Sequence, residues 1–191
     1  MIRNELYPIF LKASQLNILI VGGGAVAYEK LAFMLKSSPN ARVKLIAPDF
    51  SDDVLLLSSL YKVELIKEEY NISVLVNQNM VIAATNNKRV NVQVYNDCKS
   101  ANILINVADT PDYCDFYLGG IVTKGHVKVA ISTNGKSPTT AKRLRQFFEE
   151  VIPKDISDLV ENLNKYRSEI GGDFSNKVTR LNELTKSIIS K

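Results

Sequence analysis

The stretch LIVGGGAVAYEK, residues 19–30, decides the fold. An apolar run reaches three glycines and continues with apolar side chains at helical spacing, which predicts a strand, a tight turn and a helix. Gly22, Gly24 and Ala27 match G-x-G-x-x-G/A, in which glycines let a pyrophosphate approach the backbone and a small third residue lets helix and strand pack closely. The helix N-terminus adds free N–H groups. We expect dinucleotide binding here, with a purely structural turn as the alternative. The expected cofactor contacts are Gly22, Gly24, Ala25 and Val26.

Apolar runs and helical patterns alternate around this stretch, the order expected when crossover helices cover a parallel sheet. The predicted strands are 17–21, 42–47, 62–68, 79–85 and 102–108. The predicted helices between them are 25–38, 51–60 and about 87–99. The chain is therefore predicted to be α/β, with a Rossmann-like parallel sheet.

The pattern changes after residue 114. Residues 119–133 predict two strands around Lys124-Gly125, a β-ribbon. Residues 136–152 predict a helix with Ser137 as its N-cap and Pro138 in its first position. The remainder reads as helices joined by Gly171-Gly172. We expect a nucleotide-binding domain, a ribbon and helix segment and a small C-terminal helical region, with the bounds 1–114, 115–152 and 153–191.

The composition is that of an ordinary globular protein, with 191 residues, 46% of them hydrophobic and 23% charged. No run approaches the ~20 apolar residues of a membrane span, and the first residues lack the pattern of a secretory signal. We therefore expect a cytoplasmic protein that has no membrane partner. The net charge of +4 is too small to indicate nucleic acid by itself.

Metal-ligating side chains are scarce. Cys98, Cys114 and a single histidine, His126, cannot build a cysteine–histidine zinc site, so no metal site is predicted. Both cysteines are expected to be buried or inert thiols. His126 lies at the predicted ribbon turn, where an exposed histidine without a chemical role is expected.

The second predicted strand ends in LIAPDF, where an acidic residue usually binds the ribose of a nucleotide. Ala47 and Pro48 stand there, and Asp49 comes slightly late. Two interpretations stay open: Asp49 binds the ribose, or Pro48 packs under the adenine. No arginine follows directly to hold a 2′-phosphate, which favours NAD over NADP.

Several segments together point to one family. They are YPIFLK (7–12), VGGGAVAYEK (21–30), IAP (46–48), IAATNN (82–87), INVADTPDYCDF (105–116) and VAISTNGKSPTTAKRLR (129–145). In this order the chain resembles the precorrin-2 dehydrogenases of sirohaem synthesis, which occur as separate enzymes and as N-terminal modules of sirohaem synthases. The resemblance implies hydride transfer from precorrin-2 to NAD⁺, giving sirohydrochlorin. It also implies a homodimer in which the ribbon and helices of one subunit complete the partner's site.

Asp109 lies just past the LINV strand, and ligands of open α/β sheets bind beyond the carboxyl ends of the strands. A carboxylate there is a candidate general base, and the alternative is that it caps the turn ADTPD. The resemblance implies that Asp109 is the catalytic aspartate. Asp112 and Asp115 are the competing carboxylates.

Thr85 and Asn86 end the fourth predicted strand. Their position and the resemblance predict contacts with the ribose or nicotinamide. The alternative is that Asn86 or Asn87 only caps the next helix.

Between Phe116 and Phe148 the chain carries lysines and arginines but no Asp or Glu. Precorrin-2 is a polycarboxylate, so a basic surface beside a helix N-terminus complements it. A solvated helix face is the alternative, and the segment lacks the aromatic pattern of nucleic-acid-binding proteins. Asn134 replaces a glycine common in the family, and Asn tolerates the left-handed region better than most residues. The expected substrate contacts are Ser132, Thr133, Lys136, Ser137, Lys142 and Arg145.

Taken with the resemblance, these patterns predict NAD-dependent oxidation of precorrin-2 to sirohydrochlorin. Two alternatives stay open. One is a bifunctional enzyme that also inserts ferrous iron into sirohydrochlorin, as some members of the family do. The other is a non-catalytic module that senses NAD for a partner.

Overall fold

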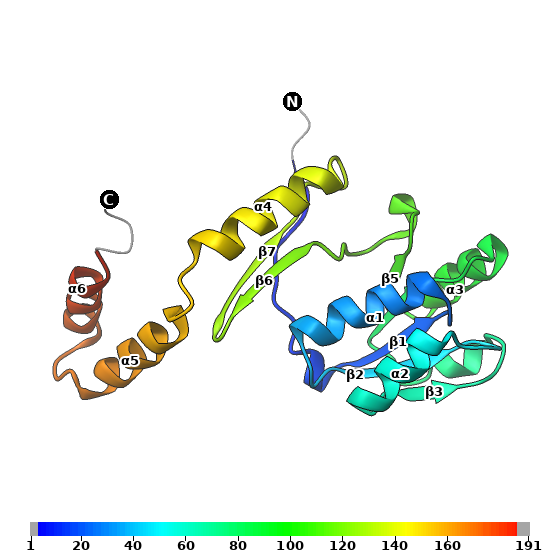
Figure 1. Ribbon diagram of the computed structural model, residues 1–191, viewed down its shortest axis with the longest axis horizontal. Coiled ribbons are helices and arrows are strands. Elements are labelled where there is room, and N and C mark those ends of the chain that lie inside the picture. The colour runs from blue at the N-terminus through cyan, green and yellow to red at the C-terminus, as the bar shows by residue number, and fades with distance from the viewer. Residues whose placement is uncertain (1–3, 187–191) are drawn as a thin grey trace. The chain divides into compact units, whose positions relative to one another are not determined.

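The computed structural model describes residues 4–186 (Figure 1). The α/β half contains β1 (Asn17–Val21), α1 (Ala25–Ser37), β2 (Arg42–Ile46), α2 (Asp52–Tyr61), β3 (Glu64–Ile66), β4 (Met80–Ala83), α3 (Lys88–Ser100) and β5 (Leu104–Val107). Short 3-10 helices are η1 (Ala13–Gln15), η2 (Ile72–Leu75) and η3 (Pro111–Tyr113). The remaining elements are β6 (Gly120–Lys124), β7 (Val127–Ile131), α4 (Pro138–Val151), α5 (Ile156–Glu169) and α6 (Phe174–Thr185).

The first five strands form one parallel sheet in the order β3-β2-β1-β4-β5. The Rossmann-like fold predicted from the glycine stretch is therefore confirmed. Strand order reverses between β1 and β4, and ligands of such sheets bind in the crevice beyond the carboxyl ends at that point. The residues after β1 and β4 therefore lie where a cofactor is expected.

The sheet is covered on both faces, because its strands are apolar at successive positions. Ile18 and Ile20 of β1 pack in one cluster with Leu31 of α1 and Val54 of α2. The alternate residues of β1 pack in a second cluster with Val94 of α3. Helices α1 and α2 therefore cover one face, and α3 covers the other (Figure 1).

Strands β6 and β7 form the predicted β-ribbon. They pair antiparallel, with Lys124 opposite Val127 across a turn in which Gly125 has φ 54°. Helix α4 begins at Pro138, because the fixed φ of proline suits the first position of a helix. It packs on β6, where a Cβ added to Gly120 would lie 3.6 Å from Cβ of Arg145. A side chain on Gly125 would overlap Ser157 of α5, so the ribbon turn packs against that helix.

Several predicted strands are longer than the observed ones. The third was predicted over 62–68, but β3 covers only Glu64–Ile66. Lys62 instead ends α2 in a left-handed conformation with φ 55°. The fourth was predicted to reach residue 85, but β4 ends at Ala83, where the chain turns toward α3. Apolar runs extend past strand ends because loop residues also cover the core.

The described chain divides into two compact units. The first contains residues 4–119 and 132–138, and the second contains 120–131 and 139–186. The predicted three-part division, with bounds at 114 and 152, stays a prediction. Among the helices of residues 4–186, none is both long and apolar enough to cross a bilayer.

Candidate functional site

The glycine turn joins the ends of three strands. Gly22 has φ 137°, and its N–H donates to the carbonyl of Ile46 at 2.9 Å. A Cβ on Gly22 would overlap the carbonyl oxygen of Ala84, which follows β4, and one on Gly23 would overlap that of Asp49, which follows β2. Glycine is therefore required at these positions by close backbone approach and, at Gly22, by φ as well.

Beyond these contacts the turn is open. Gly24 is the N-cap of α1, and a Cβ built on it would meet no atom within 4 Å. No side chain caps this helix within the described chain, so the N–H groups of Ala25 and Val26 stay available to an anion. Ala27 is fully buried, as the small third residue of the motif requires. The arrangement fits a dinucleotide pyrophosphate.

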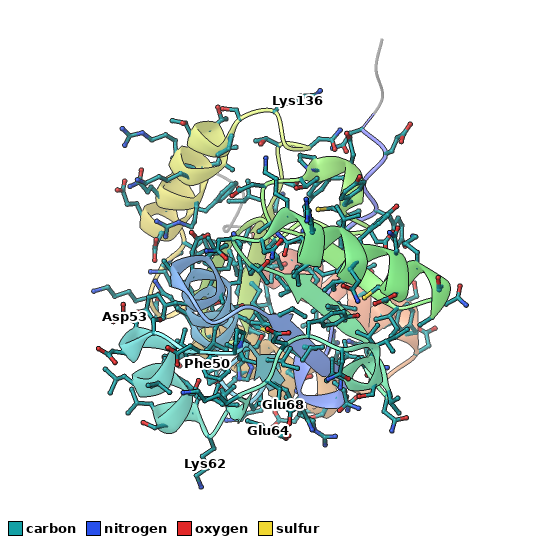
Figure 2. All side chains as sticks on the ribbon, turned by 90° about the vertical axis from the view of Figure 1, so that its right-hand side faces the viewer. Phe50, Asp53, Lys62, Glu64, Glu68 and Lys136 are labelled. Atoms are coloured by element: carbon teal, nitrogen blue, oxygen red, sulfur yellow. The ribbon has the colours of Figure 1, made fainter. Side chains whose placement is uncertain are left out.

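The residues expected at the ribose are exposed. Pro48 and Asp49 follow β2, and Phe50, labelled in Figure 2, packs against the core cluster that contains Leu31 of α1. The Asp49 carboxylate pairs with the ammonium of Lys67 at 3.1 Å. The hydrogen bond from Lys67 lowers the pKa of Asp49, so this carboxylate is charged at neutral pH.

Thr85 is held by a buried asparagine. Its hydroxyl lies 2.6 Å from Oδ1 of Asn91, whose Nδ2 donates to the Thr85 carbonyl at 3.0 Å. The side chain of Asn87 accepts from the N–H groups of Arg89 and Val90, so Asn87 caps α3. Asn86 is exposed. Contacts of Thr85 and Asn86 with a cofactor stay a prediction.

The three candidate aspartates after β5 differ sharply. Asp115 accepts from Lys99 Nζ at 2.7 Å and from the N–H of Ile105 at 3.1 Å, which fixes it to the sheet edge. Asp112 is exposed in the first turn of η3. Asp109 is exposed with φ 57°, and its carboxylate has no hydrogen-bond or ion-pair partner within residues 4–186. Of the three, Asp109 and Asp112 have carboxylates that stay accessible to a substrate.

Of the two free thiols, Cys98 is buried and Cys114 is partly buried. Cys114 contacts Nδ2 of Asn106 and the carbonyls of Val107 and Thr110, each at 3.3 Å. Burial raises the pKa of Cys98 to about 12 and raises that of Cys114. Both cysteines were expected to be buried or inert; Cys98 is buried, and that Cys114 is inert stays a prediction, which its raised pKa favours.

Within the loop expected to bind substrate, side-chain hydroxyls accept hydrogen bonds from backbone N–H groups of the same loop. Thr133 Oγ1 accepts from the Ser137 N–H at 3.2 Å, and Ser132 Oγ accepts from the Asn134 N–H at 3.1 Å. Asn134 has φ 53°, so it adopts the left-handed conformation in place of glycine. Lys136 is exposed and projects from this loop (Figure 2).

The other two candidate substrate contacts lie on α4, in the second unit. Lys142 is exposed. Arg145 is half-buried and paired with Glu149 one turn on, so part of its charge is already neutralised. His126 is exposed as predicted, with Nε2 2.9 Å from Oε1 of Glu161.

The comparisons with known proteins bear on the whole arrangement. A family model described as "Putative NAD(P)-binding" matches residues 9–120. The chain belongs to this family. A second model, "Sirohaem biosynthesis protein central", matches residues 124–150. The predicted resemblance to proteins of sirohaem synthesis is confirmed, as is a cofactor of the NAD(P) class.

Individual relatives agree. The siroheme synthase of Psychrobacter arcticus is 37% identical over 164 residues, which are 86% of this chain and 30% of that protein. That of Pseudoalteromonas translucida is 37% identical over 173 residues, 91% of this chain and 36% of that protein. The chain thus spans about a third of the length of these relatives. A solved structure, SirC, precorrin-2 dehydrogenase, superposes with a TM-score of 0.71 over 97% of this chain and 90% of that one, at 22% identity.

Sequence reasoning missed three residues that hold the site residues in place, namely Lys67, Asn91 and Asn106. It considered Asp115 only as a competing carboxylate and missed its contacts with Lys99 and Ile105. For the two asparagines a signal was present, since each is a polar residue among apolar ones in a predicted helix or strand. For the two charged residues, partners distant in sequence left no local signal.

Proposed function

We propose that this chain oxidises precorrin-2 to sirohydrochlorin with NAD⁺ as the hydride acceptor. One observation carries the proposal. The uncapped N-terminus of α1 and the unpartnered carboxylate of Asp109, among the described residues, follow strands of one parallel sheet and so belong to the same carboxyl edge. The match of the following segment to the central region of sirohaem biosynthesis proteins supports the substrate.

The proposed chemistry is a two-electron oxidation. One C–H bond of the macrocycle breaks with its electron pair leaving as hydride, and a proton leaves from a neighbouring position. The nicotinamide supplies the hydride acceptor when the cofactor is bound. Gly22, Gly24, Ala25 and Val26 hold the pyrophosphate, and Asp109 accepts the proton. Cofactor contacts of Pro48, Asp49, Thr85 and Asn86 are part of the proposal.

The substrate is proposed to bind through its carboxylates. Lys136 and Lys142 are the strongest candidates because both are exposed cations. The hydroxyls of Ser132, Thr133 and Ser137 complete the loop, and Arg145 contributes a partly neutralised charge. The acid-free composition of the segment between Phe116 and Phe148 supports an anionic ligand.

A homodimer in the cytoplasm is the proposed working form. Leu144, Phe147 and Val151 follow one another on one face of α4 and are 39%, 54% and 58% exposed. A second subunit would cover this face. The two free thiols of Cys98 and Cys114 suit a reducing compartment. Neither a nucleic-acid nor a membrane partner is proposed.

The test is oxygen-free mixing of the full chain with precorrin-2 and NAD⁺, following NADH by its absorbance. Asp109→Asn is expected to lower kcat by about 10²–10⁴, the usual contribution of a general base, with NAD⁺ binding unchanged. Asp112→Asn is the paired variant. Loss of activity in Asp112→Asn alone would move the catalytic role to that residue, and full activity in both would remove the base from the mechanism.

The alternatives have their own readouts. Iron insertion by a bifunctional enzyme predicts faster formation of sirohaem from sirohydrochlorin and ferrous iron than without protein. A sensing module predicts NAD⁺ binding with no binding of the macrocycle.

A further inference from the structure

Two oppositely charged side chains meet at the carboxyl edge of the sheet, where β2 and β3 end. Ile46 pairs with Ile66 at the last position of both strands, and the next N–H, of Ala47, donates to the Ile66 carbonyl. Lys67 directly follows β3 and reaches Asp49, with 3.1 Å between Nζ and Oδ1. Both side chains stay largely exposed, at 71% and 85%. A bound ligand therefore has access to both charges.

The backbone that carries Asp49 is fixed to the glycine turn. The carbonyl of Asp49 lies against Gly23, where any side chain would overlap it. The N–H of Ser51 donates to the Gly23 carbonyl at 2.9 Å. In a sheet of this type the pyrophosphate lies on the glycine turn, and the adenosine ribose extends toward the end of the second strand. The pair of Asp49 and Lys67 therefore lies where the 2′ position of that ribose arrives.

The two charges act in opposite directions on the two natural dinucleotides. A carboxylate accepts hydrogen bonds from the ribose hydroxyls of NAD and repels the 2′-phosphate of NADP. An ammonium attracts that phosphate. Asp49 is ionised at neutral pH, since the hydrogen bond from Lys67 lowers its pKa. The site thus contains a carboxylate that suits NAD and an ammonium that suits NADP. The ion pair between Asp49 and Lys67 decides which of the two charges meets the cofactor.

We propose that Lys67 determines cofactor preference: it orients the Asp49 carboxylate toward the ribose hydroxyls of NAD, and it binds the 2′-phosphate of NADP once the charge of Asp49 is removed. Lys67 is a positioning residue toward NAD and a direct contact toward NADP. The inference rests on the proposed function only through dinucleotide binding at the glycine turn. No step of macrocycle oxidation enters it.

A matched ion pair lies on the same two strands, away from their carboxyl ends. Lys44 of β2 and Glu64 of β3 pair at 2.9 Å, with exposures of 43% and 56%. Figure 2 labels Glu64 on β3. This pair lies within the strands rather than at their carboxyl ends. Lys44→Met therefore removes an equivalent surface ion pair at a place where the ribose does not reach.

The test measures NAD⁺ and NADP⁺ affinity of the full chain by calorimetry, without any macrocycle. Asp49→Asn is expected to lower the ratio of the NADP⁺ to the NAD⁺ dissociation constant about tenfold, because repulsion is replaced by a charge-assisted contact with Lys67. Lys67→Met alone is expected to raise the NAD⁺ dissociation constant about threefold, the scale of an exposed ion pair, because Asp49 loses the partner that orients it. Lys67→Arg keeps the wild-type ratio, and Lys44→Met leaves it unchanged.

The double variant Asp49→Asn with Lys67→Met decides the matter. Loss of the NADP⁺ gain in this variant supports the role of Lys67. Persistence of that gain without the lysine, or unchanged ratios in all variants that still bind NAD⁺, would overturn the inference and leave the proposed function standing. If the wild type binds neither dinucleotide, the inference and the proposed function fail together.

Discussion

The two units of the described chain differ in how they bury apolar surface. In the first, strands β1 and β4 contribute side chains to clusters on both faces of the sheet, and Leu19, Ile20 and Ile82 are fully buried. In the second, helices α4, α5 and α6 contain no buried residue. Its buried hydrophobic residues are Val122, Ile131 and Ile170. Folding stability therefore rests on the nucleotide-binding unit.

The two units therefore differ in what they need in order to bury their apolar surface. The first unit stabilises itself, because each face of its sheet has a helix to pack on. The second exposes an apolar face on α4 together with the basic residues proposed for the substrate. We propose that the second subunit of the homodimer covers this face.

Leu31→Ala is expected to have the largest effect. Leu31 is fully buried between α1 and the sheet, and removing such a side chain usually costs about 2–5 kcal/mol. Leu159 of α5 is 37% exposed, so Leu159→Ala serves as the matched control with a loss below about 1 kcal/mol. Denaturant unfolding measures both. Equal losses would contradict the distinction between the units.

Gly22→Ala is expected to come next. A methyl group there would overlap the carbonyl of Ala84 at φ 137°, so the ends of β1 and β4 must separate, at a cost of about 1–3 kcal/mol. The variant is also expected to bind NAD⁺ more weakly than the wild type. The control is Gly24→Ala, since a methyl group on Gly24 meets no atom within 4 Å and leaves unfolding nearly unchanged. A stable Gly22→Ala protein with normal NAD⁺ binding would refute the proposed cofactor position.

Phe147→Ser probes the second unit. Phe147 is 54% exposed on α4, so the subunit itself loses little, but dimerisation is expected to weaken by about 1–2 kcal/mol. Sedimentation measures the dimer dissociation constant. Leu56→Ser, on the exposed side of α2 at 64%, is the control and leaves dimerisation intact. Weakening by Leu56→Ser instead would move the interface to the nucleotide-binding unit.

The smallest expected effect concerns Cys98 and pH. Burial raises the pKa of this thiol to about 12, so the folded protein keeps a proton that the unfolded chain releases above its ordinary thiol value. The contribution of the Cys98 thiol to the free energy of unfolding is fully present below the ordinary thiol pKa. It is lost as pH rises from there toward 12, with a slope of at most about 1.4 kcal/mol per pH unit. Unfolding of Cys98→Ala should show a shallower decline at alkaline pH. An identical pH dependence would contradict the burial argument.

Much of the nucleotide-binding unit could be predicted from local pattern. The glycine turn, Pro138 at the start of α4 and the left-handed Asn134 each follow from the conformational limits of a residue and its neighbours. The two-strand ribbon followed from a glycine between β-branched runs. These features are decided within a few residues of chain.

Other features depend on which loops adjoin in space. Lys67 meets Asp49 because β2 and β3 are neighbours, and Asp115 meets Ile105 because the chain folds back along β5. The order of strands decides such contacts, and single-sequence spacing does not contain it. Asn86 and Asn87 were equivalent in sequence for a different reason: the exact first residue of a helix is poorly defined by sequence, and only Asn87 caps α3.

The most direct test of the account is the stoichiometry of one oxygen-free turnover. Full-length protein in excess is mixed with precorrin-2 and NAD⁺, and NADH and sirohydrochlorin are measured together. The account predicts equal amounts of the two products in the wild type and a greatly slowed appearance of both in Asp109→Asn. Consumption of precorrin-2 without formation of NADH, or an unchanged rate in Asp109→Asn, would contradict it.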